Sequence, residues 1–316
     1  MFAIMAPGQG SQTPGMLAGW LRDPVHAERV RAWSQAADCD LVHLGTRASA
    51  AEIARTENTQ PLLVALGLLA HEALATAGTG VTAGHSVGEL TAAAYAGVLT
   101  PVDAVRLAAV RGRAMAAACT EEPTSMAAVV GGDESRVQAR IAELGLYAAT
   151  FNGPGQIVAA GSAEGLRQLA AAPPPESTVK PLPVAGAFHT PYMESARQVF
   201  AKAAAATAFA APRGPLLSNA DGEVVTDPEE VRRRLVDQVV RPVRWDLCLH
   251  TLARLRPGPT VSLPPARTLA NILKRRHPEL DVLQVNTARD IGKALVRIDE
   301  SARESAREEE PAHAGV

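Results

Sequence analysis

Residues 83–90 read AGHSVGEL, and this stretch governs how the chain around it is expected to fold. Ser86 stands between Gly84 and Gly88 in the pattern Gly-x-Ser-x-Gly. That pattern is the sequence form of a nucleophile elbow, a sharp turn from a strand into a helix that exposes the serine hydroxyl. The two glycines have no Cβ to resist the turn. The alternative is a glycine-softened loop whose serine only caps the following helix, and these residues alone leave both interpretations open.

The segments on either side of this turn alternate short apolar runs with helical patterns. This alternation is typical of a mostly parallel sheet covered by helices, and so of the α/β class. The run FAIMAP at 2–7 predicts a first buried strand, and VTAGH at 81–85 predicts the strand that leads into Ser86. The further predicted elements are helices at 59–78, 88–97, 101–118 and 191–209, a strand at 215–219, two helices within 228–254, and a closing strand and helix.

A different rhythm begins at residue 125. Strand, helix, two strands, helix and strand follow one another within about 60 residues, which is the split βαβ, or ferredoxin-like, order. We therefore expect an inserted small subdomain at 124–189 and a large catalytic subdomain made from 1–123 and 190–298. The charged segment 299–316 predicts a fraying helix end that passes into disorder.

Composition narrows the class of protein. The 316 residues are 47% hydrophobic and 20% charged with a formal net charge of −2, which argues against a nucleic-acid-binding protein. No apolar run is long enough to span a membrane, and the N-terminus has neither the basic leader nor the cleavage pattern of a signal peptide. The scattered Cys39, Cys119 and Cys248 form neither a metal motif nor a disulfide framework, and they fit a reducing cytoplasm.

A serine nucleophile needs a base, and two histidines are candidates. His85 adjoins Ser86, but neighbouring side chains on a strand point to opposite faces, so His85 is expected to order the pocket instead. His189 lies in GAFHTPYM, a loop between the inserted module and the next helix, where catalytic groups are often found. The alternative is a histidine packed against its aromatic neighbours. The remaining histidines are interpreted as structural or solvated: His26, His43, His71, His250, His277 and His313.

Arg111 is unusual because the helix predicted at 101–118 places it on an apolar stripe. An unpaired guanidinium on a buried face would cost several kcal/mol. Either a carboxylate of the same chain pairs with Arg111, or a ligand carboxylate is held there in a bidentate fork. The helix pattern alone leaves both possibilities open.

Backbone amides near the predicted turn can provide an oxyanion hole. The PGQG loop at 7–10 follows the first strand, and Val87 follows the serine at a helix N-terminus. The loop lacks the GxxxxGK[ST] form of a phosphate-binding loop, and no GxGxxG follows a strand. A dinucleotide cofactor is therefore not expected.

Several stretches in order resemble malonyl-CoA:acyl-carrier-protein transacylases over about residues 1–290. The resemblance implies an α/β-hydrolase-like large subdomain with an inserted ferredoxin-like one. These stretches are PGQGSQ (7–12), GHSVGE (84–89), RGRAM (111–115), NGPGQIVAAG (152–161), GAFHTPYM (186–193), SN (218–219) and QVVRPVRW (238–245).

The resemblance also implies roles for individual residues. Ser86 corresponds to the acylated nucleophile and His189 to its general base. Arg111 corresponds to the clamp for the malonyl carboxylate. Gln9 and Val87 correspond to the residues whose amides form the oxyanion hole.

Further residues are assigned by the same resemblance. Gln238 corresponds to a glutamine whose backbone carbonyl orients the histidine, and His85 and Asn152 to residues that line the pocket. The GAFH context resembles malonyl-selective members. One departure is SLPPARTL at 262–269, where the family usually has a glycine-rich turn, and it puts the acyl or carrier preference in doubt.

The implied reaction transfers malonyl from malonyl-CoA to the phosphopantetheine thiol of an acyl carrier protein, without a metal or other cofactor, in a cytoplasmic monomer that binds neither nucleic acid nor membrane. Two alternatives stay open: an acyl-carrier-protein thioesterase that edits with the same serine, and a non-catalytic partner in a synthase complex. The basic stretches Arg232–Arg234, Arg241, Arg244 and Lys274–Arg276 are candidate docking surfaces for an acidic carrier.

Overall fold

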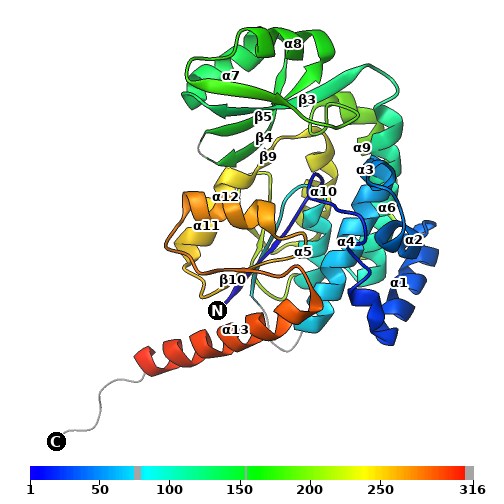
Figure 1. Ribbon diagram of the computed structural model, residues 1–316, viewed down its shortest axis with the longest axis vertical. Coiled ribbons are helices and arrows are strands. Elements are labelled where there is room, and N and C mark those ends of the chain that lie inside the picture. The colour runs from blue at the N-terminus through cyan, green and yellow to red at the C-terminus, as the bar shows by residue number, and fades with distance from the viewer. Residues whose placement is uncertain (75–79, 154, 310–316) are drawn as a thin grey trace, which may run out of the picture.

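The central sheet of the protein has strands in the order β11-β10-β1-β2-β7-β8, as seen in a computed structural model that describes residues 1–74, 80–153 and 155–309 (Figure 1). Strands β11, β10, β1, β2 and β7 run parallel, and β8 runs antiparallel to β7. The strands are β1 (Ala3–Ala6), β2 (Val81–Gly84), β7 (Leu216–Leu217), β8 (Val224–Val225), β10 (Thr260–Ser262) and β11 (Val282–Gln284).

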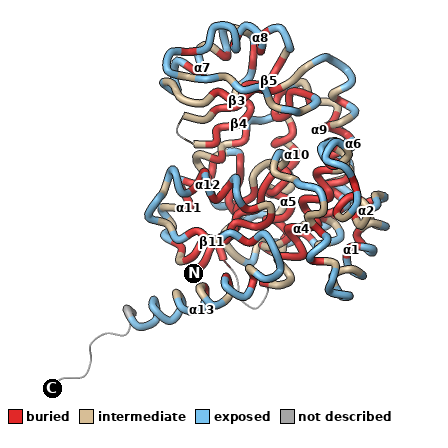
Figure 2. Tube along the Cα trace, viewed as in Figure 1, coloured by how far each residue is buried: buried red, intermediate tan, exposed pale blue. Residues whose placement is uncertain are grey.

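Both faces of this sheet are covered, which explains why β1 is an unbroken apolar run. Phe2, Ile4 and Ala6 belong to a large core shared with α4 (Thr56–Leu74), α5 (Gly88–Tyr95) and α6 (Pro101–Ala118). Ala3 and Met5, which point the other way, pack with α11 (Trp245–Leu255) and α12 (Arg267–Arg276). Figure 2 shows the buried chain concentrated along these strands and the helices beside them.

A second sheet lies above the first in Figure 1, with the strand order β6-β3-β5-β4-β9. Its first four strands run antiparallel to their neighbours, and α7 (Glu134–Glu143) and α8 (Ala163–Ala171) cover one face through a separate apolar core. The fifth strand, β9 (Val243–Arg244), comes from beyond the insertion and pairs parallel with β4. The other strands are β3 (Thr124–Gly131), β4 (Tyr147–Gly153), β5 (Gln156–Ser162) and β6 (Ser177–Pro181).

Other helices complete the large layer. Asp23, Asp40 and Ser49 cap the N-termini of three helices that the sequence pattern did not predict, each side chain accepting a backbone N–H. These helices are α1 (Pro24–Ala37), α2 (Leu41–Thr46) and α3 (Ala50–Ala54); the rest are α9 (Glu194–Ala205), α10 (Pro228–Asp237), α13 (Ala288–Glu309) and the 3-10 turns η1 (Trp20–Arg22), η3 (Pro191–Met193) and η4 (Gln238–Val240).

The α/β class predicted from the sequence is confirmed, with some differences in the elements. The helix predicted at 191–209 is a 3-10 turn followed by α9, which ends at Ala205. The segment 299–309, predicted as the start of a disordered tail, continues α13 as a helix, and its residues 302–307 are exposed (Figure 2). Ile291, Ala294 and Ile298 anchor the first half of α13 against the core. Residues 310–316, Pro154 and the predicted helix end at 75–78 lie outside the described residues. None of the described helices combines the length and apolar character needed to cross a bilayer.

Candidate active site

Ser86 sits in a sharp turn between β2 and α5. Its backbone has a φ of +54°, in the left-handed region that non-glycine residues seldom adopt. The turn packs directly under the loop after β1: His85 N donates to Ala6 O at 2.9 Å, and a Cβ on Gly88 would overlap that carbonyl. The close approach explains why the turn needs a glycine at position 88.

Two amide side chains hold the strained turn. Asn219, which follows β7, accepts from Ser86 N at 2.8 Å and donates to Gly84 O at 2.7 Å. Gln238, at the end of α10, donates from Nε2 to Ser86 O at 3.0 Å. The backbone N–H of the serine is therefore satisfied by the Asn219 side chain, and its C=O accepts from the Gln238 side chain and from Glu89 N.

The structure brings Ser86 and His189 together from positions 103 residues apart. Ser86 Oγ lies 2.7 Å from His189 Nε2, and His189 Nδ1 lies 2.8 Å from the Gln238 carbonyl oxygen. Because a carbonyl only accepts, Nδ1 carries the proton and Nε2 is left to accept from the serine hydroxyl. His189 also has a positive φ, +62°, in a loop fastened by bonds from Thr190 Oγ1 to Ala187 O and from Ala187 N to Thr124 Oγ1.

His189 is buried, with 5% of its surface exposed. Burial, followed by the nearby positive charge of Arg111, lowers the pKa of His189 from 6.5 to about 3. The imidazole is therefore neutral at physiological pH, which is the form that accepts a proton from a hydroxyl.

Arg111 is 2% exposed, and its guanidinium lies beside the Ser86 hydroxyl. Its Nη1 donates to Gln60 Oε1 at 2.7 Å and its Nη2 to Gln238 Oε1 at 2.8 Å, while Nη2 lies 3.4 Å from Ser86 Oγ. No carboxylate of the described chain lies within ion-pair distance of this guanidinium. Burial lowers the pKa of Arg111 to about 10, so the group stays cationic at neutral pH. The buried cation is therefore hydrogen-bonded to neutral amide oxygen atoms and lies beside the serine hydroxyl.

The other predicted site residues lie around this centre. His85 Nε2 is 2.8 Å from Asn152 Oδ1, and its ring meets Trp245 edge-on, so His85 is not placed to act on Ser86. Burial lowers the pKa of His85 below its usual value. Neither the Gln9 nor the Val87 backbone N–H has an acceptor within the part of the chain that is described.

Three residues of the centre were assigned no role from the sequence: Gln60, Glu89 and Asn219. Each is a buried polar residue. Glu89 and Asn219 stand within quoted motifs, GHSVGE and SN, so the motifs contained the signal although their chemistry alone did not reveal it. Gln60 carries a weaker signal, since it stands in the apolar helix α4 only one turn from its start.

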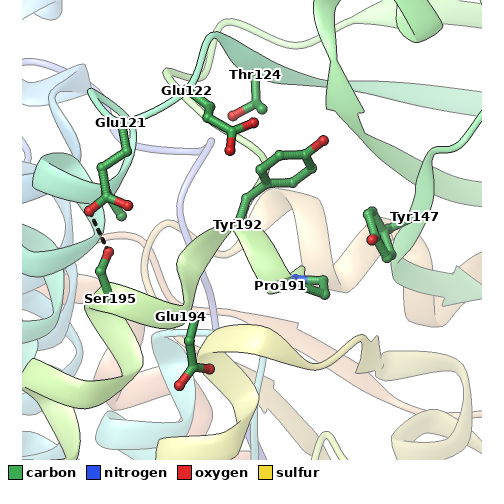
Figure 3. A pocket seen from close by; sticks show the side chains of 9 residues that line it. Glu121, Glu122, Thr124, Tyr147, Pro191, Tyr192, Glu194 and Ser195 are labelled. Atoms are coloured by element: carbon green, nitrogen blue, oxygen red, sulfur yellow. Dashed lines mark hydrogen bonds between the residues drawn. The ribbon is translucent and has the colours of Figure 1, made fainter.

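Two of the hollows in the described structure differ in the charge of their lining. One, of about 500 Å³, is lined by Gln238, by arginines that include Arg241 and Arg244, and by Asp221 and Asp237. The other, of about 370 Å³, lies between α6, β4 and η3, and Figure 3 shows carboxylates of Glu121, Glu122 and Glu194 around it. The two hollows differ in the sign of the charge around them.

Comparison with known proteins identifies the family to which the chain belongs. The family model described as the acyl transferase domain matches residues 4–303. The malonyl CoA-acyl carrier protein transacylase of Mycobacterium tuberculosis (strain H37Rv) is 52% identical over 280 residues, which cover 87% of this chain and 93% of the relative. The chain belongs to the malonyl-CoA:acyl-carrier-protein transacylase family. The resemblance found in the sequence is thereby confirmed.

Solved structures of this transacylase family share the fold. The crystal structure of MCAT from Mycobacterium tuberculosis has a TM-score of 0.90 at 49% identity and covers 92% of this chain and 98% of that chain. PlMCAT:AntF (holo), a type II PKS acyl-carrier protein in complex with its malonyl-transacylase, has a TM-score of 0.87 at 30% identity and covers 93% and 99% of the two chains. The second structure is of a transacylase bound to its carrier protein.

Proposed function

We propose that the protein transfers a malonyl group from malonyl-CoA to the phosphopantetheine thiol of an acyl carrier protein through a malonyl ester of Ser86. The observation that carries this proposal is the buried Arg111 cation, which has neutral partners and lies 3.4 Å from Ser86 Oγ. A malonyl unit carries its carboxylate only one methylene beyond the thioester carbonyl. A cation beside the nucleophile matches that short reach.

In the first half-reaction, His189 Nε2 takes the proton of Ser86 Oγ as the oxygen bonds to the thioester carbonyl carbon. The negative charge that develops on the carbonyl oxygen is stabilised by the amides of Gln9 and Val87. The carbon–sulfur bond then breaks, and the CoA sulfur leaves with the proton from His189. Arg111 holds the malonyl carboxylate throughout.

The second half-reaction reverses these steps with a new thiol. His189 takes the proton of the phosphopantetheine thiol, the sulfur bonds to the ester carbon, and Ser86 Oγ leaves with that proton. Gln238 O keeps the imidazole in the required tautomer in both halves. These two half-reactions need no metal or cofactor. The free thiols of Cys39, Cys119 and Cys248 fit a reducing, cytoplasmic setting.

For carrier docking, we favour the basic residues that have no acidic partner. Arg232, Arg233 and Arg234 pair with acids on or near α10, and Arg244 pairs with Asp246. Arg241 and the Lys274–Arg276 stretch have no carboxylate partner among the described residues. Arg275 donates to Gln156 Oε1, which places the end of α12 beside the β4–β5 hairpin. An acidic carrier is expected to meet these cations at the junction of the two sheets.

Intact-protein mass spectrometry after mixing with malonyl-CoA tests the proposal. A malonyl adduct is expected on the protein, absent from Ser86→Ala and removed when a phosphopantetheinylated carrier is added. CoA and malonate that accumulate without carrier would indicate a thioesterase. No adduct and no free CoA would indicate a non-catalytic partner.

Replacement of Arg111 by Ala tests the clamp. Malonyl transfer is expected to fall at least about a hundredfold more than acetyl transfer, because a charge-assisted bidentate contact contributes about 3 kcal/mol or more. Rates of Ser86 acylation by malonyl-CoA and acetyl-CoA measure the difference. Equal losses for the two substrates would contradict the assignment of Arg111.

A further inference from the structure

Glu89 is a buried carboxylate that the proposed proton transfers do not use. It lies in the first turn of α5, one turn after Ser86, and is 5% exposed. Its Oε1 accepts from Asn219 N at 2.6 Å, and its Oε2 accepts from Gln238 Nε2. Both partners are donors, so the position suits a group that only accepts hydrogen bonds.

The partner amide of Gln238 connects Glu89 to Arg111. Its Nε2 donates to Glu89 and to Ser86 O, and its Oε1 accepts from Arg111 Nη2. The opposite orientation of the amide would set its oxygen against two acceptors and its NH₂ against a guanidinium. The surrounding groups therefore allow one orientation, with the oxygen facing Arg111.

We propose that Glu89 is a positioning residue: in its ionised form, which only accepts hydrogen bonds, it fixes which way the Gln238 amide faces, and so aims the Arg111 guanidinium at the acyl group. This inference rests on the malonyl transfer proposed above. Gln238 also lies between Arg111 and Glu89. The guanidinium therefore bonds to a neutral oxygen and does not form an ion pair with Glu89, the only buried acid nearby in the described chain.

A carboxamide at position 89 would break this arrangement. Its single oxygen would be taken by the fixed backbone donor of Asn219, which leaves its NH₂ facing Gln238 Nε2. If Gln238 kept its orientation, two donors would oppose each other. If Gln238 turned over, its oxygen would oppose Ser86 O and its NH₂ would oppose Arg111. Either response loosens the hold on the guanidinium.

The effect on substrate choice separates this role from a merely structural one. Through Asn219, Glu89 supports the turn at Ser86, which every acyl donor needs. Through Gln238 it supports Arg111, which only a donor with a distal carboxylate needs. A structural defect lowers malonyl and acetyl rates together, whereas a misaimed guanidinium lowers the malonyl rate more.

The test compares Ser86 acylation by malonyl-CoA and by acetyl-CoA in the wild type and in Glu89→Gln. The rates are measured at about pH 8.5, because burial raises the pKa of Glu89 to about 8 and most of the wild-type side chain is then ionised. The comparison is thus between a carboxylate and a carboxamide at position 89. The ratio of malonyl to acetyl rates is expected to fall about tenfold, the factor for one hydrogen bond to a charged group. Glu134→Gln, the same change in the exposed first turn of α7, is the control and should leave the ratio unchanged.

Gln238→Met provides the second arm, since it removes the amide but keeps the backbone carbonyl that orients His189. The ratio is expected to fall by a similar factor, and the double variant should fall no further, because both changes act through one contact. If Glu89→Gln does not fold, as judged by its thermal melt, Gln238→Met alone decides. A ratio within about twofold of the wild type in Glu89→Gln, or in Gln238→Met, would overturn the inference. A wild type that malonyl-CoA does not acylate would instead refute the proposed function.

Discussion

Two residues of the site hold their side chains in place through unfavourable backbone geometry. Ser86 and His189 both have a positive φ, which costs about 1–3 kcal/mol at each position and persists only where neighbours enforce it. Here Asn219 and Gln238 enforce the turn at Ser86, and hydrogen bonds around Ala187 fasten the histidine loop. In the proposed reaction, the hydroxyl and the imidazole are therefore aligned before the substrate binds, which removes a reorganisation step.

The pH dependence of acylation follows from the charge around His189. With a pKa of about 3, the imidazole stays neutral as the pH falls through 6.5, so no loss of rate is expected there from this group. Removal of Arg111 takes away one of the causes that lower this pKa, and the acid limb should move to higher pH in Arg111→Ala. Burial and the neighbouring His85 still hold it below 6.5.

Single-turnover acylation by acetyl-CoA between about pH 2.5 and 8 reaches both acid limbs and involves no titrating malonyl carboxylate. A wild-type limb centred near 6.5, the ordinary pKa of histidine, would contradict the expectation. A limb that stays in the same place in Arg111→Ala would show that the guanidinium does not act on His189.

At the scale of elements, the turn between β2 and α5 depends on the absence of side chains. A Cβ on Gly88 would overlap Ala6 O, and a Cβ on Gly84 would overlap Gly88 itself. We expect Gly88→Ala to lower the free energy of unfolding by about 1–3 kcal/mol and to disturb acylation of Ser86. Denaturant unfolding and intact-protein mass measure the two effects.

Gly292→Ala is the matched control for that substitution. Gly292 lies on the exposed face of α13 with nothing within 4 Å of an added Cβ, and its φ is not positive. Alanine there should raise the free energy of unfolding by up to about 1 kcal/mol through helix propensity. Equal losses from both alanines would mean that the close contact at Gly88 has no special role.

The elements that carry the site could be predicted from the sequence because their patterns are local. Glycines around Ser86, alternating apolar strands and an arginine on an apolar stripe all express themselves within a few residues. The short β9 could not be predicted, since two residues have no periodicity and their pairing with β4 is a long-range contact. The same reason hid Gln60 and Glu89, whose roles arise only where α4, α5 and α10 converge.

At the scale of the whole molecule, charge is distributed unevenly around the junction of the two sheets. Arg241 and the end of α12 are basic, and the hollow of Figure 3 is acidic. An acidic carrier is therefore expected to approach from the Arg241 side. Charge reversals on the two sides can test this, because use of the carrier and acylation by a small substrate can be measured independently.

Arg241→Glu and Lys274→Glu should each lower kcat/KM for the carrier about tenfold at low salt, with a smaller effect at high salt. Acylation of Ser86 by a small malonyl thioester that lacks the CoA phosphates should be unchanged. Glu122→Lys, on the acidic side, is the control and should not weaken carrier use. A loss in Glu122→Lys as large as that in Arg241→Glu would place the docking face elsewhere.

The pairing of β9 with β4 has a practical consequence. Val243 and Arg244 close the β4 side of the small sheet, although they belong to the segment that follows α10. A fragment of residues 124–189 expressed by itself would lack β9. The backbone N–H and C=O groups along that edge of β4 would be unpaired, and such an exposed edge promotes self-association. A transfer of residues 124–189 into another acyltransferase should therefore include residues 243–244.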